Sequence, residues 1–197
     1  MRKIVVSEFV SADGVMEAPE TWQFPFQTGE IGAITERQTN AIEALLLGRV
    51  TYEVFAGFWP TQTNNEFGVA DKYNRMPKYV VSTTLQKGDW NNSTLIQSNI
   101  IEEIRKLKQQ PGGAIGIIGS ATLVHSLLDA GLVDEVQLLV HPLVLGTGVR
   151  LFVEGGRPFS MQLADSQILA NGVVFLSYQI ERHEQPTETD QSEVTGA

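Results

Sequence analysis

The chain of 197 residues contains no cysteine, which excludes disulfides, thiolate metal sites and cysteine nucleophiles. Long apolar runs are also missing, and residues 1–14 are too short and too polar a stretch to serve as a signal peptide. Cations are few, with 14 Lys and Arg against 23 Asp and Glu and a net charge of −9. This balance argues against nucleic acid or an anionic membrane as a partner. We therefore expect a cytoplasmic protein with a small-molecule ligand.

The remaining composition is that of a globular protein. Hydrophobic residues make up 42% of the chain and charged residues 19%, and the length suffices for one well-filled core. We expect one domain over residues 1–183, followed by a polar tail at 184–197 that is disordered. The three histidines, His125, His141 and His183, lie far apart without ligand spacing, so no metal site is predicted.

The most informative stretch is residues 114–132. A short β-branched run at 114–118 predicts a buried strand, and the small residues Gly119, Ser120 and Ala121 follow it directly. Apolar residues at helical spacing then run to the glycine at 131, which is typical of a helix end. A strand, a small-residue turn and a helix can present backbone N–H groups to an anion. Alternatively, the small residues only let the helix pack close to the strand.

Strands and helices alternate through the first two thirds of the chain. Asn171-Gly172 between two β-rich runs predicts a hairpin near the C-terminus. The predicted strands are 3–10, 44–48, 78–82, 94–97, 114–118, 135–141, 161–170 and 173–182, and the predicted helices are 28–42, 49–58, 99–109 and 122–130, with 64–75 either a helix or a structured loop. This order predicts an α/β fold with a mixed sheet, parallel at its centre and antiparallel at its C-terminal edge.

Polar and small residues gather where four of these strands end, at 11–14, 48–51, 82–84 and 119–122. The carboxyl ends of parallel strands meet at one edge of a sheet, where ligands of such folds bind. One shared site explains all four groups, whereas independent turns would have to be invoked four times.

Five motifs in this order resemble the dihydrofolate reductase superfamily. They are SADG at 11–14, LLLGRVTYE at 45–53, KYVVSTTL at 78–85, IIGSA at 117–121, and GLVDE with HPLVLGTGVRLF at 131–152. Over residues 3–180 the chain is most similar to the reductase domain of the bifunctional riboflavin-biosynthesis deaminase-reductase. The resemblance implies a dihydrofolate-reductase-like three-layer fold with helices on both faces, NADPH as cofactor, and a homodimer.

The resemblance also implies roles for the strand-end residues. Arg49 and Thr51 match positions that face the cofactor phosphates, and Ser82 and Thr83 match positions near the 2′-phosphate. Ser120 replaces the second glycine of a Gly-Gly pair that binds the pyrophosphate and is joined by a cis peptide bond. A cis bond without proline costs about 3–4 kcal/mol, so the role transfers more readily than the geometry. The full cofactor set is Phe9, Val10, Ala12, Gly48, Arg49, Thr51, Ser82, Thr83, Thr84, Ile118, Gly119, Ser120, Ala121, Thr122 and Leu123. A surface charge at Arg49 and an ordinary strand-end turn at Ser82 and Thr83 are the alternatives.

On the substrate side, the resemblance suggests Asp13 and Glu30 as catalytic carboxylates, because a buried carboxyl there could relay a proton. For Glu30 the alternative is an exposed side chain favoured by the helix dipole. Trp22, Phe55 and Trp59 could stack on a planar substrate or simply pack in the core, and Arg150 is the candidate cation for a substrate phosphate.

The resemblance therefore implies an NADPH-dependent reductase that transfers hydride to a small planar heterocyclic or sugar-derived substrate. The reaction would resemble that of the 5-amino-6-(5-phosphoribosylamino)uracil reductase of riboflavin biosynthesis. Dihydrofolate reduction and a non-catalytic NADP-binding module are the alternatives.

Overall fold

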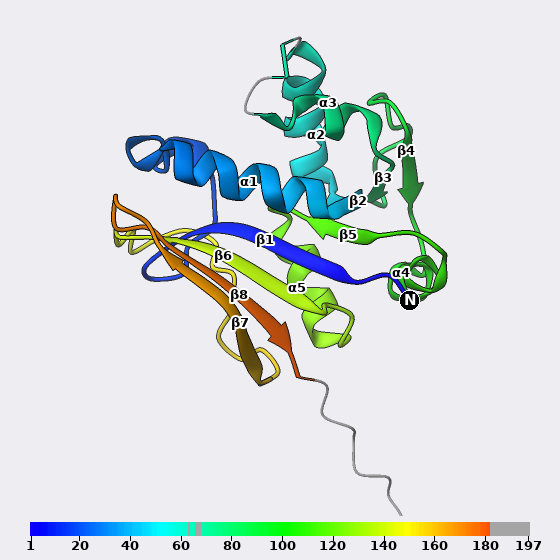
Figure 1. The fold of residues 1–197 in the computed structure, drawn as a ribbon. Helices are drawn as coiled ribbons and strands as arrows, with labels where there is room; N and C mark the ends of the chain where they lie inside the picture. Colours follow the sequence, from blue (N-terminus) through cyan, green and yellow to red (C-terminus); the bar gives the residue numbers. More distant parts are fainter. Residues whose placement is uncertain (63, 66–67, 182–197) are drawn as a thin grey trace, which may run out of the picture.

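A computed structural model describes residues 1–62, 64–65 and 68–181. The strands of this part of the chain form one eight-stranded sheet (Figure 1). The strand order is β4-β3-β2-β5-β1-β6-β8-β7, with β8 antiparallel to both neighbours and the first six strands parallel. The strands are β1 Ile4–Ser11, β2 Ile42–Gly48, β3 Lys78–Val81, β4 Ser93–Ile96, β5 Ala114–Ile117, β6 Glu135–His141, β7 Met161–Ile168 and β8 Val174–Ile180. This confirms the predicted mixed sheet. The predicted tail at 184–197 lies outside the described residues.

Helices cover both faces of the sheet. α1, α2 and α3 lie on one face, and α4 and α5 lie on the other (Figure 1). The helices are α1 Gly29–Ala41, α2 Arg49–Phe58, α3 Ala70–Arg75, α4 Ile100–Gln109 and α5 Ala121–Asp129. Within the ambiguous stretch at 64–75, residues 70–75 form the helix α3. The aromatic loop before α1 contains two short 3₁₀ turns, Pro19–Thr21 and Phe24–Phe26, which its two prolines favour.

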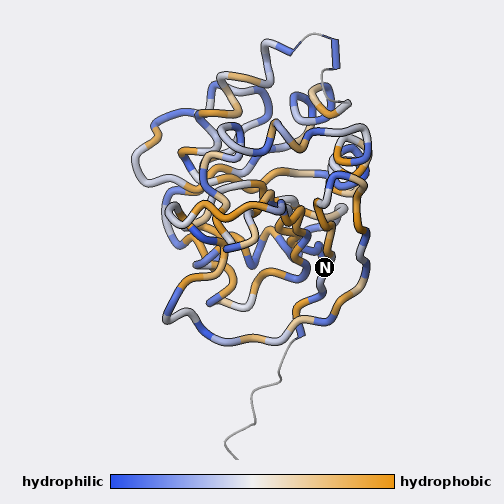
Figure 2. Tube along the Cα trace, turned by 90° about the vertical axis from the view of Figure 1, so that its left-hand side faces the viewer, coloured by the Kyte–Doolittle hydropathy of each residue, from blue (hydrophilic) through white to orange (hydrophobic). Residues whose placement is uncertain are grey.

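Side-chain alternation along the strands divides the core between the two faces. In β2, Leu46 points to the α4–α5 layer, while Leu45 and Leu47 point to the α2–α3 layer, and all three are fully buried. Figure 2 shows many apolar segments gathered in the middle of the molecule and many polar segments toward its outside. Burial of each such leucine stabilises the fold by about 1.5–3 kcal/mol.

Local sequence signals set several element ends. The Thr28 side chain accepts a hydrogen bond from the Ile31 N–H at 3.5 Å, as an N-cap of α1 should. Gly172 adopts a φ of 85° in the turn between β7 and β8, which confirms the predicted hairpin.

The sheet order places the four polar strand ends side by side, because β3, β2, β5 and β1 are consecutive neighbours. β1 pairs with β5 only over Ile4, Val5 and Val6. It then continues along β6 to Ser11. Among the described residues, this second half of β1 has no strand neighbour on the β5 side. β1 and β5 therefore part at the edge where the predicted site lies.

Candidate functional site

The turn between β5 and α5, formed by Gly119 and Ser120, is the centre of the candidate site and is called the anion turn below. Gly48 N–H donates to Ser120 Oγ at 2.9 Å, and Ser120 N–H donates to Thr51 Oγ1 at 3.0 Å. The start of α2 and the start of α5 are thereby tied together. The structure thus brings together the two groups of residues that the sequence analysis placed at the cofactor phosphates.

The backbone of the anion turn is left-handed at both residues, with φ of 65° at Gly119 and 60° at Ser120. The peptide bond between them is trans, so the geometry of the Gly-Gly pair in dihydrofolate reductases is not reproduced here. A Cβ at Gly119 would lie 3.0 Å from Thr51 Oγ1. Glycine is therefore needed at 119 for its φ and for the close approach of α2.

Glu8 supports the anion turn from β1, and the sequence analysis missed it. Its side chain is only 6% exposed, and its Oε2 accepts a hydrogen bond from Gly119 N–H at 2.9 Å. Burial raises the pKa of this carboxyl well above its ordinary value, and the Gly119 hydrogen bond offsets only part of the shift. A lone charged residue within an apolar strand was the signal in the sequence that could have indicated it.

Arg49 is the first residue of α2 and is half-exposed at the strand-end edge. Its Nη1 lies 2.8 Å from Glu53 Oε2, one helical turn further along. The guanidinium is a planar fork with five donors, so this single contact leaves donors for a second anion. Glu53 would compete with a bound phosphate for this side chain.

The residues at the end of β3 form a compact turn of their own. Ser82 is buried, and its Oγ accepts hydrogen bonds from Leu85 N–H at 2.9 Å and Thr84 N–H at 3.2 Å. This geometry favours the ordinary-turn interpretation for Ser82 itself. Thr83 and Thr84 remain exposed beside it.

The other predicted cofactor residues are in varied environments. Val10 and Leu123 are buried in the core on the α5 side, and Phe9 packs edge-on against His141 at 5.5 Å between ring centres. Ala12 N–H donates to Leu143 O at 2.8 Å. Ile118 and Ala121 are half-buried, and Thr122 is exposed.

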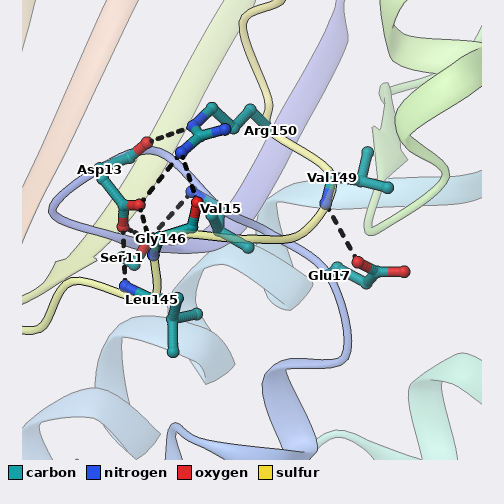
Figure 3. A network of polar contacts seen from close by, with 8 residues as sticks. All are labelled: Ser11, Asp13, Val15, Glu17, Leu145, Gly146, Val149 and Arg150. Atoms are coloured by element: carbon teal, nitrogen blue, oxygen red, sulfur yellow. Dashed lines mark hydrogen bonds and ion pairs between the residues drawn. The ribbon is translucent and has the colours of Figure 1, made fainter.

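Asp13 joins two loops and is surrounded by donors (Figure 3). Its carboxylate accepts hydrogen bonds from Ser11 Oγ at 2.7 Å, from Leu145 N–H at 3.1 Å and from Gly146 N–H at 2.9 Å. These bonds, the one from Ser11 most of all, hold the pKa of Asp13 below its usual range. Asp13 therefore stays ionised at neutral pH, which suits a positioning role better than proton donation.

Arg150 completes this loop network (Figure 3). Its Nε donates to the Asp13 carbonyl at 3.0 Å, and its Nη2 lies 3.2 Å from Asp13 Oδ2. The cation predicted for a substrate phosphate is thus held by Asp13, although its side chain is 43% exposed.

Glu30 makes its described hydrogen bond with the β7–β8 turn. It is exposed in the first turn of α1, and its Oε2 accepts a hydrogen bond from Ala170 N–H at 3.3 Å, at the β7–β8 turn. This arrangement fits the helix-start alternative of the sequence analysis. Among the described residues, no three His, Asp or Glu side chains cluster as a metal site would require.

The aromatic residues predicted to hold a substrate belong to two different clusters. Trp22 is buried, donates from Nε1 to Glu17 O at 2.9 Å, and packs edge-on against His141. Phe55 and Trp59 instead pack against Tyr73 on the α2–α3 side. Trp22 is therefore a core residue of the loop before α1.

The fold and the edge-located anion turn define a dihydrofolate-reductase-like α/β protein. More narrowly, the chain belongs to the RibD C-terminal domain family, whose model matches residues 2–175. No helix within the described part of the chain is long and apolar enough to span a bilayer.

Two curated relatives come from Bacillus subtilis (strain 168). "Uncharacterized protein YyaP" is 33% identical over 141 residues, covering 71% of this chain and 74% of the relative. "Uncharacterized protein YwjB" is 31% identical over 157 residues, covering 78% of this chain and 84% of the relative.

Two solved structures share the fold at low identity. A Shewanella sp. PV-4 protein described as a "Putative riboflavin biosynthesis protein" superposes with a TM-score of 0.71 at 19% identity, covering 91% of this chain and 99% of its own. A pyrimidine reductase-like protein from Corynebacterium diphtheriae superposes with a TM-score of 0.64 at 13% identity, covering 92% and 93% of the two chains. These likenesses establish the architecture.

Proposed function

We propose that the protein is an NADPH-dependent reductase that binds the cofactor at the carboxyl edge of β3, β2, β5 and β1. The observation that carries this proposal is the pair of hydrogen bonds linking Gly48, Ser120 and Thr51. They join two helix starts around one turn, and helix starts favour anions through their free N–H groups and dipoles.

The donor chemistry of the turn fits a diphosphate. The hydroxyl oxygens of Ser120 and Thr51 already accept hydrogen bonds from backbone N–H groups, so each keeps its own hydrogen to donate to a ligand. Arg49 supplies the positive charge at the first position of α2. The missing Cβ of Gly119 lets α2 and α5 approach each other closely. Thr83 and Thr84, exposed at the end of β3, would meet the 2′-phosphate.

NADPH, when bound, supplies a hydride to the substrate. The chain orients both ligands by holding the loops beside β1. Asp13 anchors the turn after β1 to the segment 145–150 through its bonds to Leu145, Gly146 and Arg150. We place the nicotinamide beside the end of β1, at Phe9, Val10 and Ala12, and an anchored loop keeps this strand end in a fixed position.

For the substrate, we favour a small planar heterocycle of the pyrimidine class. The family match and the two structural relatives support this assignment, because one relative is described as pyrimidine reductase-like and the other as connected with riboflavin biosynthesis. Arg150 would bind a substrate phosphate by exchanging part of its contact with Asp13.

The test is NADPH oxidation, followed by its absorbance, with aminopyrimidines, the ribosylaminouracil phosphate and dihydrofolate as substrates. Turnover with an aminopyrimidine and weaker turnover with dihydrofolate would support the proposal. Failure of NADPH to bind at all would contradict it.

A second candidate is a non-catalytic NADP-binding module. It is favoured by the ionised, fully engaged Asp13 and by the exposed Glu30, which leave neither predicted carboxylate placed as a buried acid. NADPH binding without turnover of any substrate in the panel would establish this alternative.

A further inference from the structure

Glu8 is a carboxylic acid in a row of apolar side chains. Every second side chain of β1, from residue 4 to residue 10, points to the α4–α5 layer. Ile4, Val6 and Val10 belong to the core on that side. Glu8 is 6% exposed in that row. Because an unpaired charge in such a place is strongly disfavoured, the residue needs a reason to be there beyond packing.

The position of Glu8 coincides with the point where β1 leaves β5. The last paired residue of β1 on that side is Val6, and the Glu8 side chain then reaches the backbone of the anion turn. Its Oε2 accepts the Gly119 N–H at 2.9 Å. Its Oε1 is buried and has no hydrogen-bond partner among the described residues. The Glu8 side chain thus fixes Gly119, the first residue of the anion turn, by a hydrogen bond.

Within the part of the chain that the structure describes, no cation is paired with Glu8. Its described polar contact is the Gly119 N–H, and burial and that hydrogen bond account for its raised pKa without a contribution from any charged side chain. On the neighbouring strand β6 it lies beside Leu138. Glu135 and His141 of that strand alternate with Leu138 and therefore point to the opposite face.

The charged groups on the other surrounding elements have partners of their own. Arg49 of α2 is paired with Glu53. Asp13 of the loop after β1 is paired with Arg150. The His125 ring on α5 contacts the carbonyls of Arg150 and Leu151 through Nε2. Ionisation of Glu8 would therefore place an uncompensated negative charge directly beneath the anion turn.

We propose that Glu8 is a positioning residue for the anion turn, and that the turn binds a diphosphate-containing ligand only while the Glu8 carboxyl is neutral. The neutral acid still accepts the Gly119 N–H and keeps the turn in shape. The ionised acid would repel the phosphates of the ligand, because only the backbone of the anion turn would separate the two charges in a region of low dielectric. The proposal rests on the proposed use of this turn for the diphosphate of NADPH.

The experiment measures dissociation constants of NADPH and, separately, of inorganic pyrophosphate from about pH 6 to about pH 10. Wild type is compared with Glu8→Gln, which keeps the acceptor but never ionises, and with Glu8→Met, which removes the acceptor. Asp129→Asn, at the exposed far end of α5, is the matched control for loss of one negative charge. Thermal unfolding of each variant establishes that it is folded.

In wild type, binding should weaken by up to about tenfold per pH unit above the pKa of Glu8, because binding is then linked to uptake of one proton. Glu8→Gln should match wild type at the lower pH and lose this alkaline weakening, while Asp129→Asn keeps it. Glu8→Met should bind about tenfold more weakly than Glu8→Gln at every pH, because Gly119 N–H is left without its acceptor. Rescue by glutamine but not by methionine separates the charge effect from the positioning effect.

Alkaline weakening that persists unchanged in Glu8→Gln would overturn the proposal, as would a wild type without such weakening. Pyrophosphate binding with the Glu8-dependent pH profile, but without NADPH binding, would support Glu8 and refute the cofactor. If neither ligand binds wild type at any pH, both proposals are wrong.

Discussion

Replacement of Arg49 tests the cofactor assignment most directly. In the free protein Arg49 pairs with Glu53 at 2.8 Å, with both side chains about half-exposed. A charge-assisted hydrogen bond to phosphate contributes about 1.5–3 kcal/mol, and release of the exposed ion pair to form it costs about 0.2–1 kcal/mol. The net loss in Arg49→Ala is about 0.5–2.8 kcal/mol, which weakens NADPH binding by roughly 2- to 100-fold.

Titration of NADPH and NADH into wild type and variant identifies which phosphate Arg49 contacts. If it contacts the 2′-phosphate, only NADPH binding weakens, because NADH lacks that group. If it contacts the diphosphate, both weaken equally. In either case wild-type binding should weaken as salt is added, because the contact is ionic and partly exposed.

Arg105→Ala is the matched control for Arg49→Ala. Arg105 is also half-exposed on a helix, and it pairs with Glu102 one turn away at 3.9 Å. Its replacement should leave both affinities unchanged. If Arg49→Ala likewise changed neither affinity, Arg49 would not belong to the site, and the cofactor assignment would lose its cation.

Three further predictions concern stability and assembly. Asp13→Asn should lower the thermal midpoint at neutral pH, and the difference from wild type should shrink below the ordinary aspartate pKa of about 3.9, because a lowered pKa stabilises the folded state only where the unfolded group is ionised. Lys78 is fully buried with its ammonium 4.2 Å from the Trp90 ring, and burial lowers its pKa to about 8. As the pH rises from about 8 to about 10.5, the unfolding free energy of wild type should therefore increase by on the order of 3 kcal/mol relative to that of Lys78→Met. A difference between the two proteins that stays constant with pH would contradict this prediction. Light scattering should give twice the chain mass of 21.7 kDa, because the edge strand β7 exposes apolar side chains such as Leu163 and Ile168. Leu163→Glu should shift the mass toward that of one chain. A wild type that has the mass of one chain would refute the expected homodimer.

Local sequence patterns were sufficient to predict the order of the strands and helices. The β-branched runs, the Thr28 cap and the Asn171-Gly172 hairpin all act through nearby backbone geometry, and the structure has them where the sequence places them. The mixed sheet follows, because helical connections between strands produce parallel pairs and a tight turn produces an antiparallel pair.

Contacts between distant residues were decided only by the tertiary structure. The bonds that join Gly48, Thr51 and Ser120 span about 70 positions in the chain, and the bond from Gly119 to Glu8 spans 111. No local pattern encodes such contacts, since they depend on which strands become neighbours. The same holds for Asp13, which accepts hydrogen bonds from Leu145, Gly146 and Arg150 as well as from its neighbour Ser11. The sequence therefore predicts which residue types can bind an anion. The protonation state and the partner of each carboxylate depend instead on burial and on the packing of β1 against the rest of the sheet.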